Sequence, residues 1–392
     1  MRDVVIASAC RTPVGAFQGA FASFSAVDLG IIAINESIKR AGIKPEDVDE
    51  CIMGCVLPAG LGQNPARQAA LRAPLPFEVG CITVNKVCGS GLKSVMLAAQ
   101  AVACGDAEVV VAGGMESMTN APYLLPKQRA GYRMGNGQVV DSMVHDGLWD
   151  HLNEFHMGMS AELCAEKYNV TRQDQDEFSV NSYNVSYKAA QEGRFKEQIV
   201  PVAVPQRKGD PKIIDTDEGL MESSMEKLGK LRTVFKKDGT VTAGNASSLN
   251  DGAAATVVMS AEKAQALGVK PLVKILAQGA AGIDPKYVLV APINSIPRVC
   301  AKINMKPTDI ELQEVNEAFS ASSVAVQRTL GLDPAKINIY GGAISIGHPI
   351  GASGARVLTT LIYAMKDTGA ANGMASLCLG GGEAVSMIVE NM

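Results

Sequence analysis

The sequence has no CxxC pair, only four histidines and no long block of basic residues. Without the cysteine and histidine spacings typical of zinc sites, no metal centre is expected. The formal net charge is −4, from 36 basic and 40 acidic side chains. This balance argues against nucleic acid or an anionic membrane surface as a general partner. An anionic ligand would have to meet a local patch of positive charge.

Long apolar runs are also missing. No run reaches the ~18–20 residues that a membrane-spanning helix needs. The N-terminus passes directly into a strand-like run, Val4 to Ala7, without the basic leader and long apolar stretch of a signal peptide. The nine cysteines are an odd number, and many lie in apolar stretches, which fits buried, reduced thiols. We therefore expect a cytoplasmic protein.

Aromatic residues are scarce, at 5%, whereas glycine is abundant, with 39 among 392 residues. Hydrophobic residues make up 47% and charged residues 19% of the chain, which is an ordinary globular profile rich in small residues and tight turns. A chain of this length accommodates two or three domains of ~100–200 residues each.

Strand-like and helix-like segments alternate over the first 117 residues. Buried strands are expected at residues 3–10, 51–57, 80–84 and 108–112, and an amphipathic helix at 26–41. The strands are apolar throughout rather than alternating, which is typical of sheets covered on both faces. This pattern predicts a layered α/β fold.

The alternation lapses between residues 117 and 248. Charges, prolines, methionines and three of the four histidines collect there. We interpret this region as a loop domain inserted into the scaffold, where substrate contacts are commonly found. Strand-like sequence returns at residues 249–260.

The last third of the chain repeats the first. Three segments recur in the same order: Pro45–Asp49 as Pro307–Glu311, Cys88–Gly91 as Gly351–Gly354, and Val109–Gly114 as Met374–Gly382. Three ordered matches indicate a duplicated half-domain. We therefore expect an N-terminal half of residues 1–117 plus 249–268, a loop domain of residues 118–248, and a C-terminal half of residues 269–392.

Cys88 lies where the strand-like segment 80–84 ends and an apolar helical run, Leu92 to Ala103, begins. Unpaired N–H groups and the dipole at the start of a helix can lower the pKa of a thiol and make it a nucleophile. The alternative is a small buried cysteine packed under a tight turn. The residues around Cys88 leave both interpretations open.

Three segments of the second half place polar or reactive side chains among small residues. Asn316 follows a strand, His348 lies in a glycine- and proline-bounded loop, and Cys378 precedes a triple glycine. Packing of the two halves against each other would bring these residues near Cys88. The glycines expose N–H donors to a ligand, which suits an oxyanion hole. Each residue also has a purely structural interpretation, as a satisfied histidine, a core cysteine or a capping asparagine.

Together these segments closely resemble the signature segments of the thiolase family, and the resemblance covers essentially the whole chain. It is carried by Val84–Leu92, Asn316–Phe319, Gly341–Gly354 and Cys378–Gly382, with further matches at Gly62–Gln68, Ala112–Glu116, His156–Gly158 and Thr240–Ser247. The nearest branch is the biosynthetic one, which joins two acetyl-CoA molecules to acetoacetyl-CoA and CoA. The resemblance implies duplicated α/β halves in an α-β-α-β-α arrangement with an inserted loop domain.

The resemblance also implies the roles of the reactive residues. Cys88 would carry the acetyl group as a thioester, His348 would accept the Cys88 proton, and Cys378 would act as acid/base at the α-carbon of acetyl-CoA. Asn316 would hold a water that completes one oxyanion site together with His348. The backbone N–H groups of Cys88 and Gly380 would form the second oxyanion site. Coenzyme A thioesters are then substrates, and neither a metal nor another cofactor is implied.

The loop domain is implied to bind coenzyme A. The residues expected along the pantetheine path are Ser247, Ala243 and Ala246. Those expected around the acyl end are Leu148, His156, Met157, Ala318 and Phe319.

Two departures from the family pattern stand out. No Lys or Arg occurs from Asp215 to Glu226, where the family usually has a basic residue, so the contacts to the adenine and phosphates stay open. Val288–Pro292 replaces a Met-Gly-x-Gly-Pro segment beside the substrate tunnel, so the chain-length preference stays open as well.

Three other functions compete with this one. They are a degradative 3-ketoacyl-CoA thiolase acting on longer chains, a decarboxylating ketosynthase on the same fold, and a non-catalytic acyl-CoA-binding protein. Ketosynthases pair their cysteine with His or Asn rather than with a second cysteine such as Cys378. A pure binding protein would not need Cys88, His348, Asn316 and Cys378 together. The resemblance further implies a homo-oligomer, either a dimer or a tetramer, and a place in fatty acid metabolism.

Overall fold

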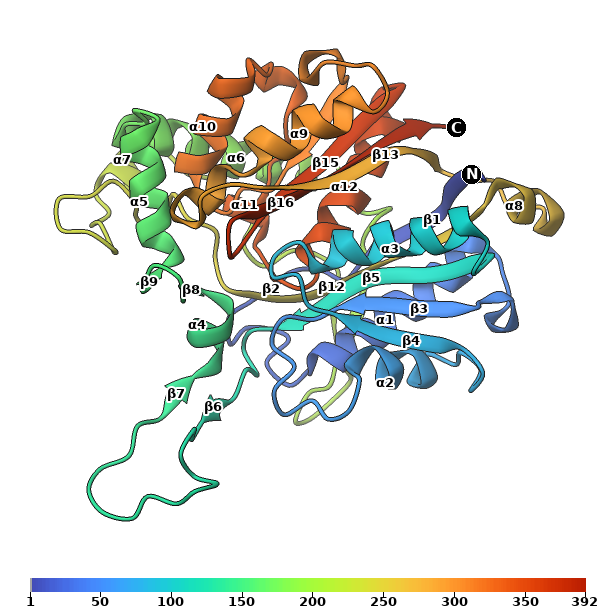
Figure 1. Ribbon diagram of the computed structural model, residues 1–392, viewed down its shortest axis with the longest axis horizontal. Helices are drawn as coiled ribbons and strands as arrows, with labels where there is room; N and C mark the ends of the chain where they lie inside the picture. Colours follow the sequence, from blue (N-terminus) through green and yellow to red (C-terminus); the bar gives the residue numbers. More distant parts are fainter. Residues whose placement is uncertain (1) are drawn as a thin grey trace.

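One ten-stranded sheet runs through the molecule, which the computed structural model describes over residues 2–392 (Figure 1). From one edge to the other the strands are β14 (Leu312–Val315), β15 (Asn372–Leu379), β16 (Glu383–Asn391), β13 (Val273–Gly282), β1 (Val4–Arg11), β12 (Asn250–Ser260), β5 (Val109–Ser117), β3 (Glu50–Gly54) and β4 (Gly80–Val84). The tenth strand, β2 (Gly15–Ala16), pairs with one end of β12. Only two residue pairs join β1 to β13, so the sheet consists of two half-sheets with a narrow seam.

The two half-sheets have the same pattern of pairing. In the N-terminal half, β1, β12 and β5 pair antiparallel in that order, and β3 pairs parallel with β5. In the C-terminal half, β13, β16 and β15 pair antiparallel, and β14 pairs parallel with β15. Matching 3₁₀ turns, η1 (Pro45–Asp47) and η3 (Pro307–Asp309), precede β3 and β14. This confirms the predicted duplication.

Helices cover both half-sheets and separate them. On the outer face of the N-terminal half lie α1 (Ala26–Ala41) and α2 (Pro65–Arg72), and beside the C-terminal half lie α9 (Pro292–Ala301) and α10 (Ser320–Leu330). The middle layer is formed by α3 (Ser90–Cys104) and α12 (Ser353–Thr368), which contact each other and strands of both halves (Figure 1). The predicted α-β-α-β-α order is confirmed.

The two middle helices, α3 and α12, touch each other at a pair of glycines. A Cβ atom built on Gly91 of α3 would lie 2.8 Å from the backbone N of Ala355, and one on Gly354 of α12 would lie 2.2 Å from the backbone N of Leu92. Real Cβ atoms do not approach other atoms so closely, so only glycine permits this contact. Gly91 and Gly354 are also counterparts in the sequence repeat.

Helix α3 is strongly apolar because it lies in the middle layer. The 18-residue window Val87–Cys104 has a mean hydropathy of 1.4, which differs from the expectation that no run is long and apolar enough to span a membrane. More than half of the window is buried inside the molecule, and Leu92, Val95 and Val102 are completely buried between the half-sheets. The core therefore accounts for its hydropathy.

Two predicted strands end elsewhere than expected. The predicted strand 51–57 already stops at Gly54, whereas β5 does not end before Gly113 but continues to Ser117. Both glycines of β5 pair with β12, and a Cβ atom on Gly114 would lie 2.1 Å from the carbonyl oxygen of Gly351. The glycines therefore mark close backbone approaches rather than a turn: Gly113 lies against β12 of its own half, and Gly114 lies against the C-terminal half. By contrast, α1 covers the predicted range 26–41, because a capping box at Ser25 begins it and Gly42, at φ +68°, ends it.

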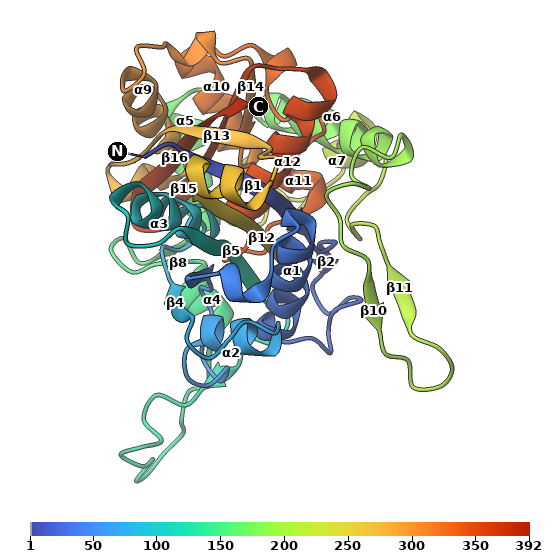
Figure 2. The same ribbon diagram turned by 90° about the vertical axis from the view of Figure 1, so that its right-hand side faces the viewer.

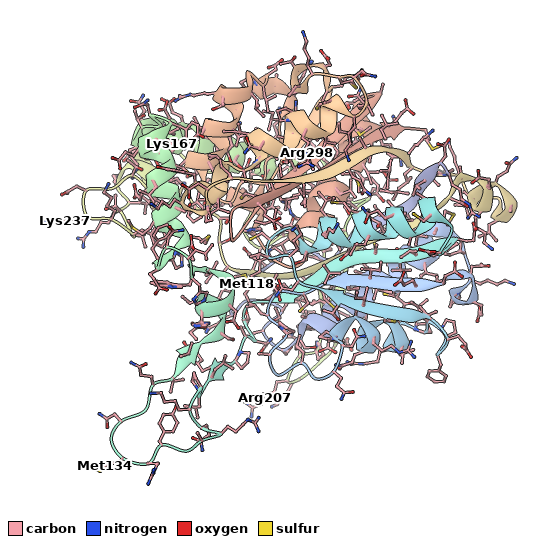
Figure 3. The ribbon with its side chains drawn as sticks, in the orientation of Figure 1. Met118, Met134, Lys167, Arg207, Lys237 and Arg298 are labelled. Carbon is pink, nitrogen blue, oxygen red and sulfur yellow. The ribbon has the colours of Figure 1, made fainter. Side chains whose placement is uncertain are left out.

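The chain between β5 and β12 lies outside the large sheet and combines short strands with helices that pack against the C-terminal half. In order, these are β6 (Tyr123–Leu124), β7 (Val140–Asp141), α4 (Ser142–Gly147), β8 (Trp149–Asp150), β9 (Phe155–His156), α5 (Met157–Lys167), α6 (Arg172–Gln191), β10 (Val202–Val204), β11 (Lys212–Ile214) and α7 (Met225–Gly229). Two parts project from the body: the arm (residues 122–141), with Met134 at its tip, and the β10–β11 hairpin, with Arg207 at its tip (Figures 1, 2 and 3). The remaining elements are α8 (Ala261–Leu267), η2 (Pro285–Val290), η4 (Pro334–Lys336) and α11 (Ala343–Ile346).

Candidate active site

A mostly apolar cavity of about 410 Å³ lies where the two halves meet the inserted segment. Twelve of the thirteen predicted site residues line it: Cys88, His348, Cys378, Gly380, Ser247, Ala243, Ala246, Leu148, His156, Met157, Ala318 and Phe319. The exception is Asn316, which is buried behind the lining. The structure thus brings together residues that lie up to 292 positions apart in the sequence, from Cys88 to Gly380.

Cys88 is presented by a strained turn between β4 and α3. Val87 has a φ of +46°, a conformation that β-branched residues rarely adopt. The turn is held by the Asn85 side chain, which accepts from Val87 N–H at 3.0 Å, and by Ser90, whose hydroxyl donates to the Val87 carbonyl at 2.6 Å. Strain that the surroundings maintain in this way is typical of functional positions.

Burial, rather than the start of the helix, dominates the ionisation of Cys88. Its thiol is enclosed by the cavity wall, and this desolvation raises its pKa to about 12. The backbone N–H groups of Gly380 and Cys88 favour the thiolate, but their effect is smaller, and Glu116 opposes it. The expectation of a lowered pKa is therefore wrong, because burial outweighs the effect of the helix start. Cys88 needs a base to take its proton.

His348 has a ring nitrogen that can accept a proton. Its ring is buried, and Nδ1 lies 2.6 Å from the Ser353 hydroxyl oxygen, while Nε2 has no partner within the described residues. The single hydroxyl proton of Ser353 is donated to the Pro349 carbonyl at 2.9 Å. Nδ1 must then carry the proton and donate it to Ser353, which leaves the lone pair on Nε2. Burial, with a smaller effect of Arg356, lowers the pKa of His348 to about 3, so the ring is neutral at pH 7.

Cys378 lies at the end of β15, beside Cys88. Burial raises the pKa of its thiol well above the usual range, and the second cause is the negative charge that Cys88 would carry. The two sulfurs are thus close enough that they do not ionise together. Gly381 and Gly382 follow with φ of +86° and +94°, so the chain turns back sharply after Gly380. The Gly380 N–H faces the Cys88 sulfur.

Asn316 keeps a free donor next to this site. Its side-chain oxygen accepts from Arg356 Nη2 at 3.3 Å, whereas its Nδ2 group is buried with no partner among residues 2–392. A buried amide donor normally has an acceptor such as an ordered water. Arg356 itself is almost completely buried in α12. Sequence reasoning missed Arg356, although an arginine inside the apolar run 355–365 was a signal.

Glu116 is a second residue that sequence reasoning did not single out. Its buried carboxylate accepts from the backbone N–H groups of Val56 at 2.9 Å, Leu57 at 3.2 Å and Gly351 at 2.9 Å. It therefore fastens the loop after β3 to the loop that carries His348. Burial raises the pKa of Glu116 to about 7 despite these donors.

An aromatic wall closes the acyl side of the cavity. The His156 ring stacks on Phe235 at 4.8 Å between centroids, and Phe235 meets Phe319 edge-on at 6.3 Å. Phe235 was not predicted, and neither were the other apolar lining residues Met118, Met143, Val144, Val234, Leu249 and Ile350. Figure 3 shows Met118 where the inserted segment joins the sheet. Leu289, from the divergent segment 288–292, also lines the cavity.

Basic side chains next to the cavity come from an unexpected segment. Arg232, Lys236 and Lys237 line a surface cleft that shares Val234 and Phe235 with the cavity, and Figure 3 labels Lys237 on this segment. This cleft supplies positive charge that the segment 215–226 does not contain.

The segment 215–226 has a structural use instead. Asp217 forms a buried ion pair with Arg11, and Glu218 accepts from the backbone N–H groups of Ala16 and Ala20. These carboxylates fasten the inserted segment to the N-terminal half.

No group of three or more His, Cys, Asp or Glu side chains within residues 2–392 is arranged to hold a metal ion. The chemistry available at the cavity is that of two thiols, a neutral imidazole base and backbone donors. This set can transfer an acyl group through a cysteine thioester.

The chain is similar to known proteins over its full length. The thiolase N-terminal domain matches residues 4–262, and the thiolase C-terminal domain matches residues 269–391. The acetyl-CoA acetyltransferase of Cupriavidus necator is 53% identical over 391 residues and is covered completely, as is this chain. That of Pseudomonas aeruginosa is 52% identical over 388 residues, or 99% of each chain. The crystal structure of the Bacillus anthracis acetyl-CoA acetyltransferase matches with a TM-score of 0.98 at 40% identity, over 100% of this chain and 99% of that one.

Proposed function

The chain belongs to the thiolase family, and we propose that it condenses two acetyl-CoA molecules to acetoacetyl-CoA and CoA, or catalyses the reverse thiolysis, through an acetyl-Cys88 intermediate. The observation that carries the proposal is the free, unprotonated Nε2 of His348 in the cavity that also holds Cys88 and Cys378. The names of the full-length relatives agree with it.

In the first step, His348 Nε2 takes the proton of Cys88, and the sulfur attacks the thioester carbon of acetyl-CoA. The new S–C bond forms as the bond between that carbon and the CoA sulfur breaks, and CoA leaves with a proton. Negative charge develops on the thioester oxygen, for which the N–H groups of Cys88 and Gly380 are the nearest backbone donors. The free Nδ2 of Asn316 would hold a water at the second oxyanion position, next to His348.

Acetylation of Cys88 prepares Cys378 for the second step. An acetylated sulfur cannot ionise, so Cys88 adds no negative charge that would oppose the Cys378 thiolate, although burial still raises the pKa of Cys378. Cys378 first gives up its own proton to His348 Nε2, which is free again once CoA has left with its proton, and the Cys378 thiolate then accepts a proton from the α-carbon of a second acetyl-CoA. The resulting carbanion attacks the acetyl carbon on Cys88, the S–C bond breaks, the departing Cys88 sulfur takes a proton back from His348, and acetoacetyl-CoA forms. The reaction therefore requires two thiols with different roles. A non-catalytic binding protein would have no need for the second thiol.

The inserted segment would bind coenzyme A. Ser247, Ala243 and Ala246 line the cavity, which shares Val234 and Phe235 with the cleft of Arg232, Lys236 and Lys237, where the phosphates would meet positive charge. Leu148, His156, Met157, Ala318 and Phe319 would enclose the acetyl end. The packed rings of His156, Phe235 and Phe319 would close the cavity beyond this end, which would favour short acyl chains over the degradative long-chain alternative.

The assembly would be a homotetramer in the cytoplasm, acting in fatty acid metabolism. β4 is an open sheet edge with exposed Ile82 and Phe77, so two copies would pair there. The arm, with exposed Tyr123, Val139 and Met134, would join two such dimers.

We also propose the domain boundaries given above: the N-terminal half is 1–117 plus 249–268, the loop domain is 118–248, and the C-terminal half is 269–392.

The test is peptide mass spectrometry of the enzyme after incubation with acetyl-CoA. We expect an acetyl group on Cys88, its removal by added CoA, and its absence in Cys88→Ala. A stable acetyl group on another cysteine would refute the assignment. Comparing thiolysis of four-carbon and eight-carbon 3-ketoacyl-CoA substrates then separates the two thiolase functions, since equal rates on both would refute the short-chain preference.

A further inference from the structure

Lys86 and Glu383 form an ion pair across the boundary between the two halves of the molecule. The Lys86 ammonium group donates to the Glu383 carboxylate, although 297 positions separate the two residues in sequence. Lys86 comes shortly before Cys88, and Glu383 comes shortly after Gly380. The ion pair therefore joins the two segments whose backbone N–H groups face the Cys88 sulfur.

Each partner of the ion pair is fixed within its own segment. The Lys86 N–H donates to the Ser90 hydroxyl oxygen at 2.8 Å, so Lys86 belongs to the strained turn between β4 and α3. Glu383 is the register partner of Leu379 in the hairpin of β15 and β16. Only the glycines 380–382 lie between these two residues. A shift of Glu383 must therefore move this short turn as well.

The two segments also touch directly beside the ion pair. A Cβ atom built on Gly89 would lie 2.4 Å from Cδ2 of Leu379, and one on Gly380 would lie 3.1 Å from Cγ1 of Val87. Such packing contacts prevent the segments from moving closer together, but they do little to prevent them from moving apart. An attraction between opposite charges supplies the missing restraint.

A second lysine adds to the importance of the Glu383 carboxylate. Lys93 lies in the first turn of α3. Burial and the positive charge of Lys86 lower the pKa of Lys93, whereas the charge of Glu383 acts in the opposite direction. Glu383 thus lies near two lysines of the N-terminal half. Without its charge, these two lysines would repel each other.

We propose that Lys86 and Glu383 are positioning residues, which hold the Gly380 N–H group against the Cys88 sulfur and so keep the two oxyanion donors together. This inference rests on the proposed function, because the donors matter only if negative charge develops on a thioester oxygen beside them. Neither Lys86 nor Glu383 lines the cavity, so both act through the backbone and not on the substrate. The ion pair needs no access from solvent, and pairing of two copies along β4 is compatible with it.

Glu383→Gln tests the proposal, because it keeps the size of the side chain and removes its charge. Complete removal of an oxyanion donor costs about 10²- to 10³-fold in kcat, but a partly exposed ion pair changes an equilibrium at most about fivefold. Since Lys86 and Lys93 would also repel each other, the single-turnover rate of Cys88 acetylation at saturating acetyl-CoA should fall about three- to fivefold. KM should stay unchanged, because the cavity lining is intact.

The charge-swapped double variant Lys86→Glu/Glu383→Lys separates positioning from other effects. It restores the attraction with the two charges exchanged, so it should recover most of the wild-type acetylation rate. Loss of a side chain with a merely structural role would not be rescued in this way.

Asp3→Asn is the matched control. Asp3 and Lys274 form another ion pair between the two halves, and their side chains are 61% and 30% exposed, compared with 47% and 24% for Glu383 and Lys86. Neither Asp3 nor Lys274 lines the cavity. Acetylation of Cys88 in Asp3→Asn should therefore proceed at the wild-type rate.

Three results would overturn the proposal: a wild-type acetylation rate in Glu383→Gln, an equal loss in Asp3→Asn, or no recovery in the charge-swapped variant. Each of these would leave the proposed function intact, since Cys88 would still become acetylated. Absence of acetyl-Cys88 in the wild type would instead refute the proposed function, and this inference with it.

Discussion

Ser353→Ala would test the base at the cavity most directly, because it leaves every lining residue in place. Ser353 is buried at the start of α12 and accepts the Nδ1 proton of His348 at 2.6 Å. Without that oxygen, nothing fixes the proton on Nδ1. The ring can then move its proton to Nε2, and a protonated Nε2 in a neutral ring cannot accept the Cys88 proton.

The magnitude follows from the loss of one buried hydrogen bond. Leaving the Nδ1–H group without an acceptor costs about 1–3 kcal/mol, and this energy separates the active tautomer from the inactive one. Each ~1.4 kcal/mol is a factor of ten in a rate, so acetylation of Cys88 should slow about 5- to 150-fold. KM should change little, because Ser353 does not line the cavity.

The assay is the single-turnover rate of Cys88 acetylation by acetyl-CoA, followed by rapid quenching and mass spectrometry, together with steady-state kcat and KM. Thr359→Val is the matched control, since it removes another buried hydroxyl of α12 that bonds only to the Ala355 carbonyl of its own helix. Ser353→Thr keeps a hydroxyl and should recover part of the rate. Wild-type acetylation in Ser353→Ala, or an equal loss in Thr359→Val, would refute the tautomer argument.

Three further predictions concern other parts of the molecule. In Cys378→Ala, Cys88 should still become acetylated, but the condensation rate should fall at least about a hundredfold, the usual minimum for a lost general base. Quenched single turnovers with labelled acetyl-CoA separate the two steps. A condensation rate equal to that of the wild type would show that Cys378 is not the base. Replacing residues 126–138 of the arm by a short turn should convert tetramers to dimers in analytical ultracentrifugation, and an unchanged mass would show that the arm does not join dimers. The pKa of Glu116 is raised to about 7 in the folded protein, so the folded state holds this proton more tightly than the unfolded chain does. The bound proton stabilises the folded state fully below pH ~4.5, and this stabilisation is lost as the pH rises through 7. The wild type should therefore lose about 3 kcal/mol of unfolding free energy relative to Glu116→Gln across that range in urea titrations, and parallel pH profiles would contradict this.

Local patterns in the sequence were sufficient for much of the fold. α1 could be bounded because its cap, its apolar face and its terminal glycine all lie within 18 residues. The duplication was visible because the turns before β3 and β14 kept the same residue types. Glycine-rich segments around Cys88, His348 and Cys378 could be connected through family resemblance, and the structure places all three at one cavity.

Residues that act through distant contacts were not predictable in the same way. Glu116 joins segments near residues 56 and 351, and nothing in its own neighbourhood points to either. Phe235 reaches His156 and Phe319 only because the inserted segment folds back over the cavity. The glycines of β5 were interpreted as a strand end, because a turn and a close interstrand approach select the same residue. The pKa of Cys88 depends on enclosure by other elements, which its helix-start position does not reveal.

The glycine crossing of α3 and α12 has a consequence for how the molecule tolerates change. Its contact is between backbones, so the spacing between the Cys88 turn and the His348 loop does not depend on which apolar side chains fill the surrounding core. Neutral substitutions can accumulate throughout the half-sheets while the reacting atoms keep their separation. A single methyl group at Gly91 or Gly354, by contrast, would push α3 and α12 apart. Cys88 and His348 would then be too far from each other, although neither of these two residues had been changed.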